Sequence, residues 1–312
     1  MTTANVSRQA LMFLARREGL KNWATRLPPL RHVAERFIAG ETAAQALQAL
    51  RGLTDQGFTA SFDHLNEEVQ DVAETHAEVG TYAELLGLIR SEGLDDKVNV
   101  SIKLSQLGLG MSHALALANA RQVVSAARAQ GNFVRVDMEG SALTDEILNV
   151  FRSLREEFGR DHVGAVMQAA LRRTEADVKA LLTLPARIRL CKGAYLESDA
   201  VAFSRKSEVD ANFVSLMQRL LDSGTYHGIA THDPRMIDET LAYAAKQRLP
   251  RNAFEFQMLY GVRRDLQRTL LAAGHPVRIY VPYGRHWYPY FMRRLAERPA
   301  NVWFVLKTLM QS

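Results

Sequence analysis

Short runs of apolar and β-branched residues alternate with longer stretches of helical character from residue 58 onward. The runs have the length of buried strands, and they cover residues 58–63, 98–103, 133–138, 163–168, 187–191, 228–231, 254–257 and 277–281. The segments between them are rich in Ala, Leu and Arg, and they predict helices over residues 75–91, 113–129, 145–158, 175–182, 210–223, 234–246 and 263–273.

Strands separated by helices predict parallel pairing through right-handed crossovers, and eight such units close a (β/α)8 barrel. An open doubly wound sheet is the alternative, but it would normally carry a glycine-rich phosphate turn after its first strand. The sequence contains no such motif. Residues 1–56 lack strand-like runs and predict three helices. We therefore expect an α/β protein with an N-terminal helical arm (1–56) and one (β/α)8 TIM-like catalytic barrel (57–312).

The amino-acid composition limits the cellular compartment and the kinds of site that this protein can have. Cys191 is the only cysteine, so an intrachain disulfide framework and a cysteine-based zinc cluster are excluded, and a reducing compartment is favoured. No stretch approaches the roughly 18 to 20 apolar residues of a membrane-spanning helix. We expect a cytoplasmic protein whose only possible membrane contact is peripheral. The net charge of +5 comes from 39 basic and 34 acidic residues, a modest excess.

Basic residues gather near the end of the chain, where residues 277–298 contain five arginines and one acidic residue. In the helix predicted from Pro289, Tyr290 precedes Arg293 and Arg294 by three and four positions, so all three lie near one face. Glu297, four residues past Arg293, is placed to orient it. Two adjacent guanidiniums form a receptor for a small carboxylate. The alternative is a surface helix with its basic residues in solvent.

Polar residues also end nearly every predicted strand, and a barrel brings these ends together at one rim. The strand-end residues are Asp63 with Glu67, Lys103, Asp137 with Met138, Gln168, Arg189 followed by 192–195, Thr231 to Asp233, Glu255 with Gln257, and Tyr280. Any one of them could be a loop residue or half of a structural ion pair, and Glu255 could pair with an inner arginine. His232 and Asp233 have no second ligand at metal-binding spacing, so we expect no metal.

Several motifs closely resemble those of the flavin-dependent proline dehydrogenases. They are RLCKGAY at 189–195, ATH at 230–232, FEFQMLYG at 254–261 and YVPYG at 280–284, followed by Tyr290, Arg293-Arg294-Leu295 and Glu297. The resemblance runs in order from about residue 58 to residue 301. The length is that of the monofunctional bacterial members.

The resemblance implies a barrel that binds FAD non-covalently at the carboxyl ends of its strands. It implies oxidation of L-proline to Δ1-pyrroline-5-carboxylate, the first step of proline catabolism to glutamate, by hydride transfer to flavin N5, with electrons passed to a membrane quinone. Arg293, Arg294 and Lys103 would clamp the substrate carboxylate. Asp137 would orient this clamp and Tyr280, and Arg189 would approach N5.

The remaining implied contacts divide between cofactor and substrate. Those to FAD fall on Met138, Gln168, Lys192, Gly193, Ala194, Thr231 and His232. Those around the proline ring fall on Tyr195, Leu259, Tyr280 and Tyr290, and Glu67 would pair with a clamp arginine in the empty site. The chain departs from the family at Asn66, where Gly is common, at Cys191, commonly Val, and at Asp233, commonly Asn.

Two other functions compete with this interpretation. A barrel with Lys103 or Lys192 at its rim could be a Schiff-base lyase. The basic terminal helix could instead bind nucleic acid or acidic lipid. The Tyr and Leu residues among the arginines suit a pocket lining better, so we expect no nucleic-acid partner, while weak peripheral membrane contact stays open beside a quinone-dependent dehydrogenase.

Overall fold

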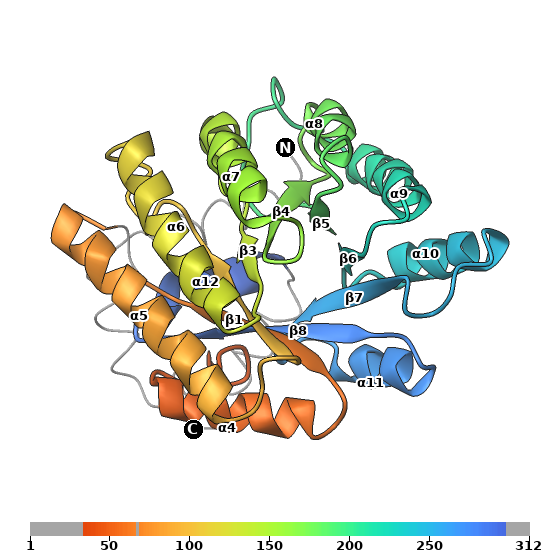
Figure 1. Ribbon diagram of the computed structural model, residues 1–312. Helices are drawn as coiled ribbons and strands as arrows, with labels where there is room; N and C mark the ends of the chain where they lie inside the picture. Colours follow the sequence, from red (N-terminus) through yellow and green to blue (C-terminus); the bar gives the residue numbers. More distant parts are fainter. Residues whose placement is uncertain (1–33, 67–68, 298–312) are drawn as a thin grey trace, which may run out of the picture.

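The computed structural model describes residues 34–66 and 69–297. Its strands form a closed parallel barrel in sequence order, and each strand pairs with the next and β8 with β1 (Figure 1). The strands are β1 (Thr59–His64), β2 (Val98–Ile102), β3 (Val134–Val136), β4 (Val163–Gln168), β5 (Arg187–Cys191), β6 (His227–Ala230), β7 (Phe254–Leu259) and β8 (Val277–Tyr283). The (β/α)8 prediction is confirmed, and the open-sheet alternative is wrong.

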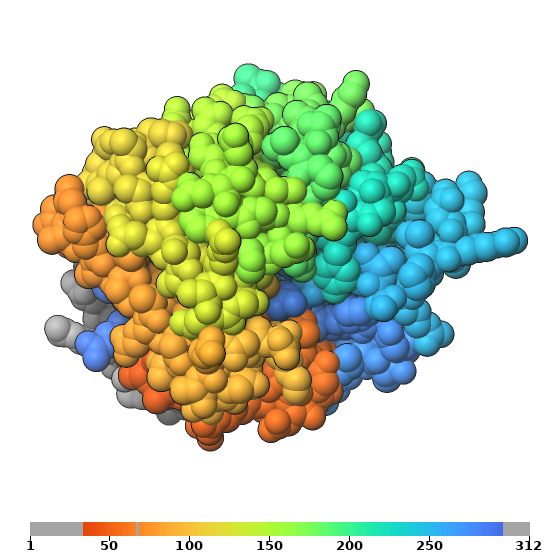
Figure 2. Space-filling view, in the orientation of Figure 1, coloured from red at the N-terminus to blue at the C-terminus, as the bar shows by residue number. Residues whose placement is uncertain are grey.

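Helices surround the barrel, and in the space-filling view successive segments follow one another around the molecule (Figure 2). They are α4 (Ala43–Thr54), α5 (Val72–Ser91), α6 (His113–Ala129), α7 (Thr144–Phe158), α8 (Thr174–Leu182), α9 (Lys206–Asp222), α10 (Pro234–Lys246), α11 (Arg264–Ala272) and α12 (Trp287–Glu297), with the 3-10 helix η1 (Ser141–Leu143) before α7. None of the helices within the described ranges is long and apolar enough to cross a lipid bilayer.

The predicted elements differ from the structure at their ends. Asp137 and Met138 were expected in the third strand, but the pairing of β3 stops at Val136. Strands β7 and β8 run on to Leu259 and Tyr283, because β8 pairs with β7 and β1 over this stretch. Of the three helices predicted in residues 1–56, α4 is present, and those within residues 1–33 lie outside the described residues. The division into an arm and a barrel at residue 57 stays a prediction.

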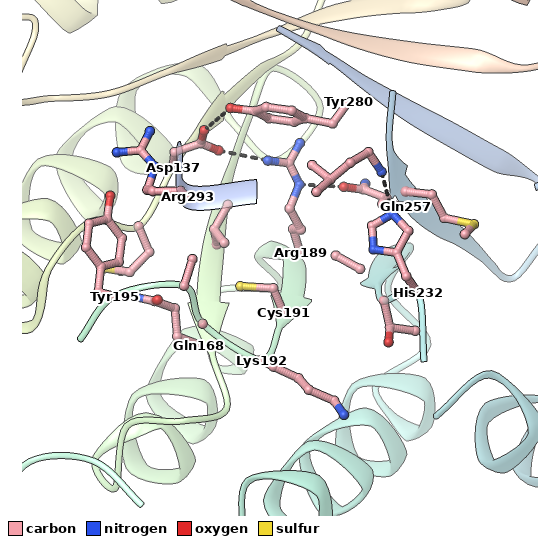
Figure 3. Close-up of a pocket in the computed structure, with 18 of the residues that line it drawn as sticks. Asp137, Gln168, Arg189, Cys191, Lys192, Tyr195, His232, Gln257, Tyr280 and Arg293 are labelled. Carbon is pink, nitrogen blue, oxygen red and sulfur yellow. Dashed lines mark hydrogen bonds and ion pairs between the residues drawn. The ribbon is translucent and has the colours of Figure 1, made fainter. Parts of the chain in front are cut away.

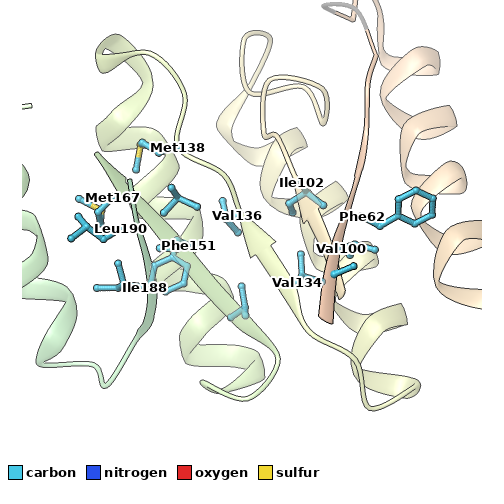
Figure 4. Packing of buried hydrophobic residues seen from close by; sticks show 14 of the residues in the cluster. Phe62, Val100, Ile102, Val134, Val136, Met138, Phe151, Met167, Ile188 and Leu190 are labelled. Atoms are coloured by element: carbon cyan, nitrogen blue, oxygen red, sulfur yellow. The ribbon is translucent and has the colours of Figure 1, made fainter. Parts of the chain in front are cut away.

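The main hydrophobic core lies between the barrel and its helices. Alternate strand residues point outward and pack against helix residues, as Figure 4 shows for Val100, Val136 and Ile188 of the strands and Phe151 of α7. These side chains are almost completely buried. The burial of this continuous apolar shell supplies the main drive for folding.

Inside the barrel the lining is polar, in contrast to the branched aliphatic layers typical of this fold. The residues between the outward-facing ones in each strand include Ser61, Arg135, Arg189, Glu255 and Arg278, and all but Arg278 are buried. Their hydrogen bonds either cross the barrel, as from Arg189 of β5 to Ser61 of β1, or join neighbouring strands, as from Arg278 of β8 to Glu255 of β7. The lumen is therefore held by hydrogen bonds and ion pairs, with the apolar shell around it.

A second, smaller hydrophobic cluster lies apart from the main core and holds α12. Its buried members are Ala34, Phe37, Ile38, Leu65, Trp287, Tyr288, Tyr290, Phe291, Met292 and Leu295. The ring of Phe291 packs against Phe37 and Trp287, with centroids 6.1 Å and 5.9 Å apart. The segment from Ala34 to Ala39 thus fixes α12 over the carboxyl end of β8.

Gly164 of β4 gives space to lumen residues. A Cβ atom there would lie 2.5 Å from Arg135 Nη1 and 2.6 Å from the carbonyl oxygen of Arg187. We expect Gly164→Ala to lower the free energy of unfolding by about 1–3 kcal/mol through overpacking. Gly87→Ala, in α5 with no atom near the new methyl, should raise it by about 0.5–1 kcal/mol. Urea unfolding followed by circular dichroism measures both, and equal stability of the Gly164 variant and the parent would contradict the steric argument.

His227 of β6 is a completely buried neutral histidine. Its Nδ1 accepts a hydrogen bond from the Ile188 amide (3.1 Å), so the ring proton lies on Nε2, which donates to Ser223 Oγ (2.9 Å). Burial, with the nearby charges of Arg135 and Arg187, lowers the pKa of His227 to about 3. Protonation would turn Nδ1 into a donor that faces another donor, so the neutral ring is the form that fits this site.

The unfolded chain binds a proton at His227 near pH 6.5, whereas the folded chain does not. Between about pH 6 and pH 4 this residue should therefore remove about 1.4 kcal/mol of stability per pH unit of acidification. In His227→Gln, whose amide can keep both hydrogen bonds, we expect a correspondingly weaker loss over this range. Urea titrations at several pH values compare the two slopes, and parallel slopes would contradict the assignment.

Candidate active site

A cavity of about 460 Å³ opens at the carboxyl ends of the strands. Every strand or the loop directly after it contributes to its lining. The expected site residues that line it are Lys103, Asp137, Met138, Gln168, Arg189, Lys192, Gly193, Ala194, Tyr195, Thr231, His232, Leu259, Tyr280, Tyr290, Arg293 and Arg294. The side chain of Glu297, at the end of α12, lies outside the described residues, as does Glu67. The sequence thus located the cavity through the residues at its strand ends.

Arg189 occupies the floor of this cavity and is almost fully buried. Its Nη1 donates to Asp137 Oδ1 (2.8 Å), its Nη2 to the hydroxyls of Ser101 and Ser61 (3.2 and 3.3 Å), and its Nε to Gln257 Oε1. Figure 3 shows the guanidinium between Asp137 and Gln257. All three nitrogens have acceptors, so the cation is held in one orientation.

Asp137 connects Arg189 to two further groups. Its Oδ2 accepts a hydrogen bond from the Tyr280 hydroxyl (2.8 Å) and lies 3.9 Å from Lys103 Nζ. Lys103 also donates to Asp63 Oδ1 and, at 3.4 Å, to the Tyr280 oxygen. Acidic and basic side chains alternate in the linked series Asp63, Lys103, Asp137 and Arg189. This alternation offsets the free-energy cost of burying the charges.

The pKa values of these linked side chains follow from their burial and from their charged neighbours. Burial would lower the pKa of Lys103, but the Asp63 and Asp137 carboxylates hold it above its usual value. Burial, with Asp137 and Asp63, raises the pKa of Tyr280 well above its usual value. Burial also raises the pKa of Asp63. Lys103 and Tyr280 therefore keep their protons near neutral pH and act as hydrogen-bond donors.

Helix α12 brings two more cations to the cavity. Arg293 and Arg294 are half-buried, and the Arg294 guanidinium lies over the Tyr290 ring, 5.1 Å from its centroid. The shared face predicted for these three residues is present. Arg293 also lies near Tyr195, whose pKa is raised mainly by burial. Together with Lys103, the arginines give this side of the cavity a positive lining suited to an anion.

The opposite side of the cavity carries a small backbone loop. Gly193 has φ +109°, and a Cβ there would lie 3.0 Å from Gln168 Oε1. Gln168 donates to the carbonyl oxygen of Glu139 (2.8 Å), and His232 Nε2 accepts from the Leu259 amide (2.8 Å). Glycine thus leaves the main chain of 192–194 exposed to the cavity, where a bound group can approach it closely.

Lys192 belongs to a four-charge cluster at the rim and is directed away from Arg189 (Figure 3). It bonds Asp210 (2.5 Å) and Asp233 (2.7 Å), and Lys206 contacts the same two carboxylates. Burial would raise the pKa of each aspartate, but the two lysines lower it. Asp233 also begins α10 by accepting from the Arg235 amide (3.1 Å). The carboxylate of Asp233 therefore pairs with both lysines and also caps α10.

Some lining residues were not singled out as site residues from the sequence. They are Asp63, Glu139, Val166, Cys191, Lys206, Ala230, Asp233, Gln257 and Met258. Asp63 and Gln257 were visible as polar strand ends, whereas Lys206 follows a long loop and gave no signal. Asn66, one of the departures from the family, donates to the buried carboxylate of Glu78 (2.8 Å), which also bonds His64.

Glu255 was expected at this rim, and that expectation is wrong. Its carboxylate faces the other end of the barrel, where it accepts from Arg278 Nε (2.8 Å) and the Tyr226 hydroxyl (3.1 Å). The two-residue alternation of a strand puts Glu255 on the same face as Gln257 but one layer deeper. The alternative pairing with an inner arginine is confirmed. Arg278 is thus separate from the basic residues of α12, and Arg285 is exposed.

Within residues 34–66 and 69–297, no group of three or more His, Cys, Asp or Glu side chains is arranged to hold a metal ion.

Comparison with known sequences identifies close relatives over almost the whole chain. The sequence profile of the family "Proline dehydrogenase" matches residues 46–307. Proline dehydrogenase from Deinococcus radiodurans is 40% identical over 307 residues, which are 97% of this chain and 98% of that protein. Proline dehydrogenase 1 from Bacillus subtilis strain 168 is 37% identical and is covered to 99%.

Solved structures agree with these relatives in fold. Proline utilization A (PutA) from Bdellovibrio bacteriovorus, inactivated by N-propargylglycine, superposes with a TM-score of 0.81 at 28% identity over 86% of this chain. This chain spans a third of that protein's length (33%). PutA from Bradyrhizobium japonicum superposes with a TM-score of 0.73 at 25% identity.

Proposed function

Since the chain belongs to the proline dehydrogenase family, we propose that it oxidises L-proline to Δ1-pyrroline-5-carboxylate in the first step of proline catabolism to glutamate. We propose further that FAD, bound non-covalently in the cavity, is the cofactor and that the electrons pass to a membrane quinone. In this proposal the protein is cytoplasmic and contacts the membrane only weakly, at its periphery.

The observation that carries this proposal is the convergence of three cations on one small cavity beside buried Arg189. Lys103 comes from the end of β2, and Arg293 and Arg294 come from α12, far apart in sequence. Guanidinium and ammonium groups so placed bind a carboxylate through charged hydrogen bonds. The rings of Tyr280 and Tyr290 and the side chain of Leu259 supply apolar surface for the pyrrolidine ring of a bound proline.

The residues opposite the cations fit a dinucleotide. The exposed main chain at Gly193 and Ala194 and the polar groups of Gln168, Thr231 and His232 are the donors and acceptors that such a ligand needs. The cavity volume lies within the usual range for small-ligand sites, about 300–1,000 Å³. We propose that these residues, with Met138 and Lys192, hold FAD. When bound, FAD supplies the electron acceptor, with hydride from proline C5 received at flavin N5.

The side chains around the substrate position it, and two of them keep their own protons. The clamp fixes the carboxylate, which limits the ways in which a small ring can lie in the cavity. Asp137 orients Tyr280 and Arg189 through its two oxygens. Lys103 and Tyr280 keep their protons, as their raised pKa values indicate, so we propose that the substrate amine loses its proton to solvent. Arg189 then stabilises negative charge that develops beside it.

The structure argues against the two competing functions. A Schiff-base nucleophile must be an unprotonated amine, but neighbouring carboxylates raise the pKa of Lys103, and Lys192 is ion-paired with two aspartates. A polyanion-binding surface requires exposed basic residues, but Arg293 and Arg294 line a cavity. Neither lysine is therefore a free amine that could form a Schiff base, and the two arginines do not form an exposed basic surface.

The cofactor proposal predicts the colour of the purified protein. We expect a yellow protein with flavin absorbance that bleaches under anaerobic conditions when L-proline is added, because two electrons move from substrate to flavin. An anaerobic visible spectrum before and after addition measures this. D-proline serves as the control ligand. A colourless protein that does not take up added FAD would refute the proposal.

The clamp predicts a selective loss of substrate affinity. Arg293→Met or Arg294→Met should raise KM for proline about 30- to 150-fold, since a charged hydrogen-bonding partner contributes on the order of 2–3 kcal/mol, while flavin content stays normal. Arg285→Met, an exposed arginine near the same helix, is the control and should keep the parent KM. Steady-state kinetics with flavin quantified by absorbance decides. A normal KM in both clamp variants would show that the carboxylate binds elsewhere.

A further inference from the structure

We propose that Gln257 is a positioning residue that holds the Arg189 guanidinium in its place beside the cofactor by linking it to the buried carboxylate of Glu255. This inference rests on the proposed function, because it assigns Gln257 a task only if Arg189 lies next to a flavin. It extends that function from the cavity surface into the layer beneath.

Gln257 is the acceptor for one specific nitrogen of Arg189. Its Oε1 accepts from Arg189 Nε, on the side of the guanidinium opposite to Asp137, as the dashed lines in Figure 3 show. Asp137 and two serine hydroxyls hold the terminal nitrogens. Gln257 is 4% exposed, so water cannot readily replace its carbonyl group. The direction of the cation therefore depends on a partner on each side.

Glu255 determines which way the Gln257 amide points. Gln257 Nε2 donates to Glu255 Oε1 (2.6 Å). Burial would raise the pKa of Glu255, but Arg278 and Arg135 hold it below its usual value, so the carboxylate stays ionised and can only accept hydrogen bonds. The amide NH2 must then face Glu255, and the amide oxygen must face Arg189. A flipped amide would oppose donor to donor and acceptor to acceptor.

The barrel also provides space for this link. Gly228 of β6 pairs with Glu255 of β7, and a Cβ atom on Gly228 would lie 2.3 Å from Gln257 Nε2. Any larger residue at this position would push the amide out of its place. Glycine at 228 thus allows the Gln257 side chain to lie across the lumen toward Arg189.

A neutral amide keeps the Arg189 charge effective. A second carboxylate at this position would neutralise the guanidinium, whereas Gln257 offers an acceptor without a full negative charge. If Gln257 is replaced by an apolar residue, Nε of the buried Arg189 side chain loses its acceptor, and the guanidinium shifts toward Asp137, its charged partner. The positive charge near a reduced, electron-rich flavin then becomes weaker, and the oxidised form is favoured.

The test is the midpoint potential of the bound flavin in Gln257→Met and Gly228→Ala, measured by spectroelectrochemical titration of the FAD-loaded proteins. We expect Gln257→Met to disfavour the reduced form about tenfold, equivalent to a potential lower by about 30 mV for a two-electron couple. Its kcat should fall while KM for proline stays within about twofold, because the clamp is untouched. Gly228→Ala tests the same link without altering Gln257, and the potential should shift in the same direction.

Gln267→Met is the matched control. Gln267 is also buried, but its amide donates only to the carbonyl oxygens of Leu259 and Val262, so its variant should keep the parent potential. A parent-like potential in both Gln257→Met and Gly228→Ala would overturn the role of Gln257. An equal shift in Gln267→Met would overturn it too, since general loosening would then explain the effect. A parent protein that takes up no FAD would instead refute the proposed function itself.

Discussion

The burial of the Arg189 charge is the constraint on which the site depends. A buried guanidinium is stable only when each nitrogen has an acceptor and a negative charge lies nearby. Its partners come from β1, β2, β7 and Asp137, which follows β3, so this one side chain is held from four places around the barrel. Asp137 extends this order to Tyr280 and Lys103. The cation that faces the cavity also organises the barrel that surrounds it.

The outer layer of the fold was predictable because it depends on local patterns. Apolar runs of strand length and helices with apolar faces identified each barrel unit, and α6 and α10 have the predicted ends. The parallel closed barrel followed from their alternation. The strand-end residues indicated the cavity for a related reason, since parallel strands in a barrel end on the same side. Arg293 and Arg294 were found because helical spacing placed them beside Tyr290.

The depth of each residue within the lumen was not predictable from the sequence. Glu255 and Gln257 are two positions apart and face the same way, but Gln257 reaches the cavity and Glu255 pairs with Arg278 at the other end. That difference depends on the stagger between neighbouring strands, which no local pattern encodes. Lys206 and Asp233 contact each other, but one follows a long loop and the other precedes α10, and no sequence pattern links the two positions. The end of β3 at Val136 likewise depends on how far β2 and β4 continue to pair with it.

The two hydrophobic clusters stabilise different parts of the molecule. Most of the apolar area is buried between barrel and helices, whereas the helix that carries Arg293 and Arg294 is held by the small cluster around Phe37, Trp287 and Phe291. Substitutions in the small cluster would act first on the packing of α12, because its members lie outside the main core. If Arg293 and Arg294 bind the substrate carboxylate, as we propose, then the short segment at Phe37 takes part in ligand binding by holding the helix that carries them.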